Sequence, residues 1–133
     1  MAVFYSHAEA DTIAWAKEYA KSLKPGDVVL LEGTMGAGKT MLAKGIIAGM
    51  GILDEVTSPT YAYVNVYGDR LFHFDCYRIT SEAQALALGF ADYFEEGGIC
   101  LVEWSENIRG ILPETCKILK ISGAGDGVRE IEF

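Results

Sequence analysis

Residues 33–40, GTMGAGKT, leave this chain few choices of local structure. They match the pattern G-x-x-x-x-G-K-[ST]. Just before them, VVLL at 28–31 is an apolar run typical of a strand buried on both faces. The next segment, KTMLAKGIIAGM at 39–50, predicts a helix that ends at Gly51. A strand, a glycine loop and a helix in this order form the context in which the pattern holds phosphate groups.

The physical reason lies in the backbone of the loop. Glycines let the chain curl so that successive N–H groups form a nest for an anion, and the N-terminus of the following helix favours the same negative charge. Lys39 would reach the β- and γ-phosphates, and the Thr40 hydroxyl would ligate Mg²⁺. A glycine-rich turn that binds nothing can show the same letters, but the flanking strand and helix favour nucleotide binding. The predicted nucleotide contacts are Gly33, Thr34, Met35, Gly36, Ala37, Gly38, Lys39, Thr40 and Met41.

The remaining segments predict one α/β domain over residues 1–133 with a mixed sheet. Residues 9–23 have helical periodicity, and SEAQALAL at 81–88 predicts a short helix capped by Ser81. The apolar stretch GICLVEW at 98–104 predicts another strand. Two hairpins complete the sheet, one pairing 61–67 with 70–75 around Gly-Asp at 68–69, the other pairing 116–122 with 128–133 around GAGDG.

Composition bounds the class of protein. Half of the 133 residues are hydrophobic, which is enough to build a core. The net charge is −8 and the eleven Lys and Arg residues are scattered, so direct nucleic-acid binding is disfavoured, because it needs clustered cations. The three cysteines, Cys76, Cys100 and Cys116, include no C-x-x-C pair, which favours reduced core thiols. Since no apolar run approaches the ~20 residues of a membrane span and no secretory signal is evident, we expect a cytoplasmic protein.

A second polar anchor is expected beside the glycine loop. Phosphoryl transfer with Mg²⁺ usually requires an acidic residue at the end of a neighbouring apolar strand. Two candidates fit, because LFHFD ends in Asp75 and ICLVE ends in Glu103. Either carboxylate could hold the metal, directly or through water, and the other could orient the attacking water. The spacing alone does not assign these roles.

Several short motifs follow one another in a fixed order. They are GTMGAGKT, TSPTY at 57–61, HFDCYR at 73–78, and LGFADYF at 88–94 leading into CLVEW at 100–104. Together they resemble the bacterial TsaE family, the small ATPases of tRNA threonylcarbamoyladenosine synthesis. The resemblance runs from the N-terminal helix to about Pro113, whereas the C-terminal hairpin is only loosely similar.

This resemblance implies an activity and partners. TsaE proteins bind ATP with Mg²⁺ and hydrolyse it slowly. They act with TsaB and TsaD, which transfer a threonylcarbamoyl group, made by TsaC as an adenylate, onto the adenosine beside the anticodon of tRNA. Hydrolysis is implied to reset the transferase between cycles. The family fold resembles the one expected from the segments: a P-loop NTPase-like mixed sheet with a parallel core, flanking antiparallel strands and helices on both faces.

The resemblance also implies roles for individual residues. Lys39 matches the phosphate-binding lysine, and Thr40 and Glu103 match metal ligands. Asp75 matches an acid needed for hydrolysis, and Trp104 matches a tryptophan needed for activity. The resemblance therefore favours Glu103 for the metal and Asp75 for positioning water or the transition state.

Two further segments carry implied roles. SPT at 58–60 occupies the place of a switch-like loop beside the γ-phosphate, which adds Thr60 to the catalytic candidates. In the family the N-terminal region helps to cover the adenine, and Thr12, in the retained pair with Asp11, is the expected contact. Two departures stand out, since the glycine expected soon after this pair is missing and Ser105 replaces the proline of many members.

Other residues allow two interpretations. His73, on a strand, is more often a hydrogen-bonded structural residue than a catalyst. Arg78 could stabilise transition-state charge, or it could hold Asp75 or a helix end. The tyrosines of 61–67 recur at period two, which predicts a core or partner-facing patch, and FEEGG at 94–98 predicts a solvated loop.

Three classes of function compete at this point. The first is an ATPase whose hydrolysis drives a partner cycle. The second is a small-molecule kinase, although no arginine-bearing lid segment is evident. The third is a nucleotide-gated adaptor without turnover, against which the intact set of Lys39, Thr40, Asp75 and Glu103 argues.

Overall fold

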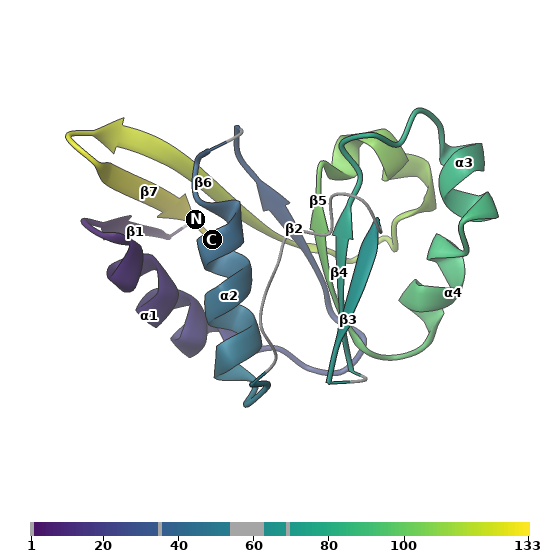
Figure 1. The fold of residues 1–133 in the computed structure, drawn as a ribbon, viewed down its shortest axis with the longest axis horizontal. Helices are drawn as coiled ribbons and strands as arrows, with labels where there is room; N and C mark the ends of the chain where they lie inside the picture. Colours follow the sequence, from purple (N-terminus) through teal and green to yellow (C-terminus); the bar gives the residue numbers. More distant parts are fainter. Residues whose placement is uncertain (1, 35, 54–62, 69) are drawn as a thin grey trace.

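In the part of the chain that the structure describes, seven strands form one sheet in the order β1-β7-β6-β2-β5-β4-β3 (Figure 1). The structure, a computed structural model, describes residues 2–34, 36–53, 63–68 and 70–133. The strands are β1 Val3–Ser6, β2 Val28–Glu32, β3 Val64–Tyr67, β4 Leu71–Asp75, β5 Ile99–Glu103, β6 Lys117–Gly125 and β7 Val128–Glu132. The helices are α1 Glu9–Ala20, α2 Lys39–Gly49, α3 Glu82–Ala87, α4 Phe90–Glu95 and the 3-10 helix η1 Ser105–Ile111.

The centre of the sheet is parallel and its flanks are antiparallel. β2 pairs in parallel with β5 and β6, and β5 pairs in parallel with β4. The hairpins β3–β4 and β6–β7 are antiparallel, and β1 pairs antiparallel with β7. The predicted mixed sheet with a parallel core is therefore confirmed. Because β2, β4 and β5 run in the same direction, their carboxyl ends meet at one edge, where the glycine loop of residues 33–38 leaves β2.

Helices cover both faces of the sheet, as predicted. In β2, Val29 and Leu31 belong to the core shared with α1 and α2, whereas Val28 and Leu30 belong to the core shared with α3, α4 and η1. This alternation is expected for a central strand that is buried on both sides. The two helix groups are separated by the sheet in Figure 1. The glycine loop thus lies between the α2 face and the strand ends.

Most predicted elements are present, with three additions. The predicted cap is confirmed, since Ser81 Oγ accepts a hydrogen bond from the backbone N–H of Gln84 at 3.1 Å. The sequence analysis did not predict β1, α4 or η1. The prediction of a solvated loop at 94–98 is wrong for its first residues, because α4 continues to Glu95. Phe94 stacks on Phe74 with a centroid distance of 5.1 Å. None of the described helices has the length and hydropathy that a membrane span requires.

The tyrosine pattern at 61–67 has a mixed outcome. Tyr67 is buried at the end of β3, which agrees with a core position. Tyr63 lies just before β3 with φ +62, so it does not continue the strand alternation. The first two residues of the predicted strand lie outside the described part of the chain. The structure therefore supports the hairpin but gives it a shorter first strand.

Candidate active site

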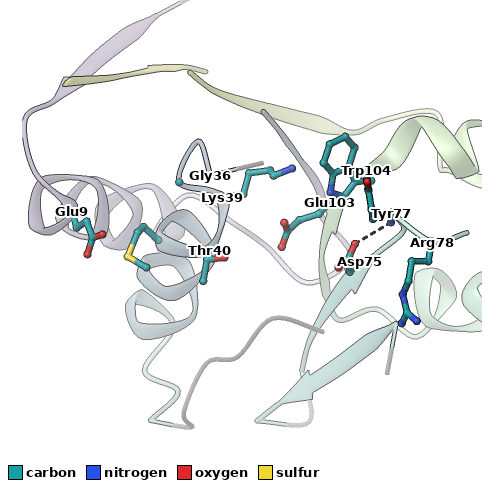
Figure 2. Close-up of a pocket in the computed structure, with 11 residues that line it drawn as sticks. Glu9, Gly36, Lys39, Thr40, Asp75, Tyr77, Arg78, Glu103 and Trp104 are labelled. Carbon is teal, nitrogen blue, oxygen red and sulfur yellow. Dashed lines mark hydrogen bonds between the residues drawn. The ribbon is translucent and has the colours of Figure 1, made fainter. Parts of the chain in front are cut away.

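A cavity of about 560 Å³ opens at the carboxyl edge of the parallel strands (Figure 2). The glycine loop and the start of α2 form one wall, and the ends of β4 and β5 form the other. Figure 2 shows Lys39 and Thr40 on the first wall, with Glu103 and Asp75 across from them. The lining residues are Glu9, Gly36, Gly38, Lys39, Thr40, Met41, Asp75, Tyr77, Arg78, Glu103 and Trp104.

Glycine is required in the loop for two separate reasons. Gly36 and Gly38 have φ values of +81 and +115, a region that side chains other than glycine rarely adopt. Gly33 instead packs tightly against β6, since a Cβ there would lie 2.6 Å from the backbone oxygen of Ile121. Gly38 is also the N-cap of α2, so the first N–H groups of this helix face the loop. These are the properties of a backbone that can surround an anion.

Lys39 is a buried cation at the edge of the cavity. The residue is only 6% exposed, and Nζ donates a hydrogen bond to Gly33 O at 2.8 Å. Burial lowers the pKa of Lys39, while the charges of Glu103, Asp75 and Glu106 oppose that shift. None of the carboxylates in the described residues forms a salt bridge with Lys39. A buried ammonium without a carboxylate partner is costly, so this wall suits an anionic ligand.

The two predicted acids lie side by side on adjacent strands. Asp75 and Glu103 are register partners at the ends of β4 and β5. Asp75 Oδ1 accepts a hydrogen bond from Tyr77 N at 3.0 Å, whereas Glu103 Oε2 lies 2.6 Å from His73 Nε2. Glu103 is buried and Asp75 is partly exposed. A hard divalent cation fits carboxylate and hydroxyl oxygens of this kind.

The protein offers few ligands for a metal of its own. Within the described residues no group of three or more His, Cys, Asp or Glu side chains is placed to hold an ion. Glu103 and the Thr40 hydroxyl could hold a metal here only together with ligands from a bound molecule. Mg²⁺ is usually bound in this way, through one or two carboxylates plus phosphate oxygens.

Trp104 connects the two walls. It follows β5 directly, has φ +58, and is the N-cap of η1. Lys39 Nζ lies 3.9 Å from the centroid of its ring, and the ring of Tyr77 lies 5.0 Å away on a tilted plane. The indole therefore covers the amine of Lys39 and reduces its contact with water.

Comparison with known proteins decides the family. A family model described as "Threonylcarbamoyl adenosine biosynthesis protein TsaE" matches residues 6–131. The chain belongs to the TsaE family. A TsaE protein of Bacillus subtilis is 44% identical over 126 residues, covering 92% of this chain and 78% of the relative. One of Treponema pallidum is 37% identical over 128 residues, covering 95% of both chains. Both relatives are named tRNA threonylcarbamoyladenosine biosynthesis protein TsaE.

A solved structure agrees with the TsaE assignment. The crystal structure of YdiB from Bacillus subtilis superposes with a TM-score of 0.84 at 38% identity, covering 98% of this chain and 82% of that one. The resemblance drawn from the motifs is confirmed. The TsaE match also extends beyond Pro113 through the C-terminal hairpin, which the motifs linked only loosely to the family.

Most of the site residues predicted from the sequence lie at the cavity. It is lined by Gly36, Gly38, Lys39, Thr40, Met41, Asp75, Glu103 and Trp104. Gly33 and Thr34 instead line a neighbouring hollow beside β6, and Ala37 is buried. Met35 and the segment 58–60, with Thr60, lie outside the described residues. Their roles stay predictions.

Thr12 lies away from the cavity lining. Its side chain is buried, and its Oγ1 lies 2.6 Å from Ser6 Oγ. Because Ser6 Oγ already donates its hydrogen to Ala8 O at 2.8 Å, Thr12 is the donor in this pair. The Thr12 hydroxyl therefore secures the start of α1 to β1, and contact with adenine stays a prediction. Glu9, one turn earlier, is the α1 residue that lines the cavity.

The sequence did not predict Glu9 and Tyr77 as lining residues, and it left the roles of Arg78 and His73 open. Tyr77 follows Asp75 by two residues, and its backbone N–H fixes that carboxylate, which the HFDCYR motif alone could have suggested. Arg78 lines the cavity, and its guanidinium carbon lies 4.9 Å from the centroid of the Tyr63 ring. His73 is fully buried and bonded to Glu103. Period two along β4 places His73 and Asp75 on one face, which is the signal that could have found it.

Proposed function

We propose that this protein binds ATP with Mg²⁺ in the cavity and hydrolyses it slowly. One observation carries the proposal: a buried lysine at a glycine loop, without a salt bridge among the described residues, faces two adjacent carboxylates across a single cavity. The lysine and loop suit phosphate, and the carboxylates suit a divalent cation. Phosphoryl transfer needs both, because it depends mainly on positioning and on stabilising charge.

The phosphate end of ATP would occupy the glycine loop. Backbone N–H groups at the N-terminus of α2 favour negative charge, and the loop glycines leave room for close approach. Lys39 would then transfer its hydrogen bond from Gly33 O to phosphate oxygens, exchanging a neutral acceptor for a charged one. Trp104, stacked against the same amine, would keep water from competing for it.

The two acids would take separate tasks. Thr40 and Glu103 would hold the metal, and a bound Mg²⁺ supplies positive charge that offsets the developing charge on the phosphate oxygens. Asp75, partly exposed and fixed by Tyr77 N, would orient the attacking water. This division agrees with the burial of the two carboxylates, because the water-facing task falls to the more exposed one.

The biological process follows from the family. We assign this protein to threonylcarbamoyladenosine modification of tRNA in the cytoplasm, where hydrolysis would reset a TsaB–TsaD transferase between cycles. The net charge of −8 supports action through protein partners rather than direct binding to tRNA, because tRNA is itself negatively charged. The open cavity leaves the site accessible for completion by a partner.

Phosphate release tests the proposal directly. Purified protein with ATP and Mg²⁺ should release phosphate slowly without any acceptor, and addition of TsaB and TsaD should raise the rate. Release only in the presence of a small-molecule acceptor would instead indicate a kinase, and tight ATP binding without any turnover would indicate an adaptor.

A second experiment tests the biological process. Depletion of the protein in its host should remove threonylcarbamoyladenosine from bulk tRNA, and unchanged modification would contradict the assignment.

A further inference from the structure

Glu103 and His73 form a buried pair across two strands. His73 Nε2 lies 2.6 Å from Glu103 Oε2, with His73 0% and Glu103 7% exposed. In the parallel register, Asp75 is opposite Glu103 and His73 is opposite Leu101. Residues two apart on a strand point to the same face, so His73 approaches Glu103 diagonally from beneath Asp75.

The hydrogen bond fixes the proton on the imidazole. A carboxylate only accepts hydrogen bonds, so Nε2 carries the hydrogen. The other ring nitrogen, Nδ1, is buried and has no hydrogen-bond partner within the described part of the chain. His73 therefore directs one N–H at Glu103.

We propose that His73 is a positioning residue for Glu103: it holds Oε2 by a hydrogen bond, so that the carboxylate presents Oε1 to the divalent cation that accompanies the nucleotide. The inference rests on the proposed function, because it requires Glu103 to be a metal ligand. Hydrogen-bonding partners of ligating carboxylates restrict their orientation, and losing such a partner typically weakens metal binding by about 10–100-fold.

A packing role alone does not account for this histidine. The side chains that share its face on β4 and β5 include Leu71 and Leu101, both fully buried and apolar. An apolar residue at position 73 would fill the site without leaving a buried nitrogen unpaired. The polar ring gains one hydrogen bond there, and its acceptor is an acid that lines the cavity.

Metal affinity, measured apart from turnover, tests the inference. The protein is loaded with a non-hydrolysable ATP analogue, and Mn²⁺ binding is titrated by electron paramagnetic resonance. His73→Leu should weaken Mn²⁺ binding about tenfold or more, whereas affinity for the analogue without metal should stay within about twofold. His73→Gln, whose amide can reach the former Nε2 position, should recover most of the loss. If His73→Leu does not fold, His73→Asn replaces it, because its amide is too short to reach Glu103.

Two comparison variants separate the possible failures. Phe72→Leu alters a buried neighbour on the opposite face of β4 and should leave Mn²⁺ affinity unchanged. Glu103→Gln should weaken Mn²⁺ binding by itself. If Glu103→Gln weakens binding but His73→Leu does not, or if Phe72→Leu weakens it equally, the positioning role is overturned and the proposed function stands. If Glu103→Gln has no effect, the metal role in the proposed function fails, and the inference fails with it.

Discussion

Lys39 Nζ lies 3.9 Å from the centroid of the Trp104 ring, so the first residue of α2 contacts the residue that directly follows β5. Trp104 adopts a left-handed backbone conformation with φ +58, which costs a residue other than glycine about 1–3 kcal/mol. A desolvated cation–π contact contributes about 2 kcal/mol and offsets a cost of that size. The contact thereby links the glycine loop to the strand that carries Glu103.

The aromatic face of Trp104 should matter more than its bulk. Trp104→Phe keeps a weaker π face over Lys39, whereas Trp104→Leu removes it. We expect the rate of phosphate release to fall in the order wild type, Phe, Leu, with a loss of about tenfold for Leu, which corresponds to ~1.4 kcal/mol. Single-turnover phosphate release measures this order. Equal rates for the Phe and Leu variants would show that the cation–π contact is irrelevant to catalysis.

Removing the charge of Lys39 should separate binding from stability. Lys39→Met keeps most of the stem but loses the ammonium, so ATP affinity should be abolished. Folding should change little, because the variant loses the cation–π contact with Trp104 but also the desolvation cost that lowers the pKa of Lys39. Binding of a fluorescent ATP analogue and thermal denaturation give the two readouts. The matched variant Lys44→Met, at a half-buried position on α2, should retain ATP affinity; equal losses in both would refute a specific role for Lys39.

The close contact between α1 and α2 should make Gly45 intolerant of a methyl group. A Cβ at Gly45 would lie 2.4 Å from Ala16 Cβ and 2.6 Å from Ile13 O. Helix propensity alone predicts that Gly45→Ala gains about 1 kcal/mol, whereas overpacking costs about 1–3 kcal/mol and displaces α1. We expect a net fall in the free energy of unfolding, measured with urea. Ala48→Gly, at an exposed site on the same helix, should lose only about 1 kcal/mol, and a more stable Gly45→Ala variant would refute close packing.

Two buried thiols should make the fold sensitive to alkaline pH. Burial raises the pKa of both Cys76 and Cys100 to about 12, from the ordinary value of 9.0. Unfolded thiols ionise first, so their contribution to stability is fully present below pH 9.0 and is lost as the pH rises towards about 12. Urea unfolding of Cys76→Ala and Cys100→Ala, compared with wild type at pH 8 and pH 10, measures the change. The wild type should lose more free energy of unfolding between pH 8 and pH 10 than either variant. An equal loss in all three proteins would contradict the burial of the thiols.

Where local chemistry determined structure, the sequence was sufficient to predict it. The glycine loop requires positive φ at Gly36 and Gly38, and the helix that follows begins at Lys39 as expected. The apolar runs ending in Asp75 and Glu103 became adjacent parallel strands, because runs of that kind fit a sheet covered on both faces. Register then brought the two carboxylates together, although spacing alone could not distinguish their roles.

Tertiary contacts determined what the sequence did not predict. Short β1 shows little alternation and is held by pairing with β7 at the edge of the sheet. The helix α4 is only six residues long, and the packing of Phe90 and Phe94 on Phe74 stabilises it rather than its own propensity. The hydrogen bond between His73 and Glu103 joins side chains 30 residues apart in the sequence. Period two places His73 and Asp75 on one face of β4, but only the register of β4 with β5 brings His73 to Glu103.

The two acids should support turnover without being needed for nucleotide binding. Asp75→Asn keeps an oxygen that can accept from Tyr77 N, and Glu103→Gln keeps the shape of a buried side chain, so both variants should fold. Each loses the negative charge that metal binding or water positioning requires. We expect ATP affinity within a few-fold of wild type and phosphate release reduced by about 10²-fold or more. The control Glu106→Gln removes an exposed acid from a neighbouring hollow that Trp104 also lines, and it should release phosphate normally. Normal phosphate release from both acid variants would rule out the two-carboxylate mechanism.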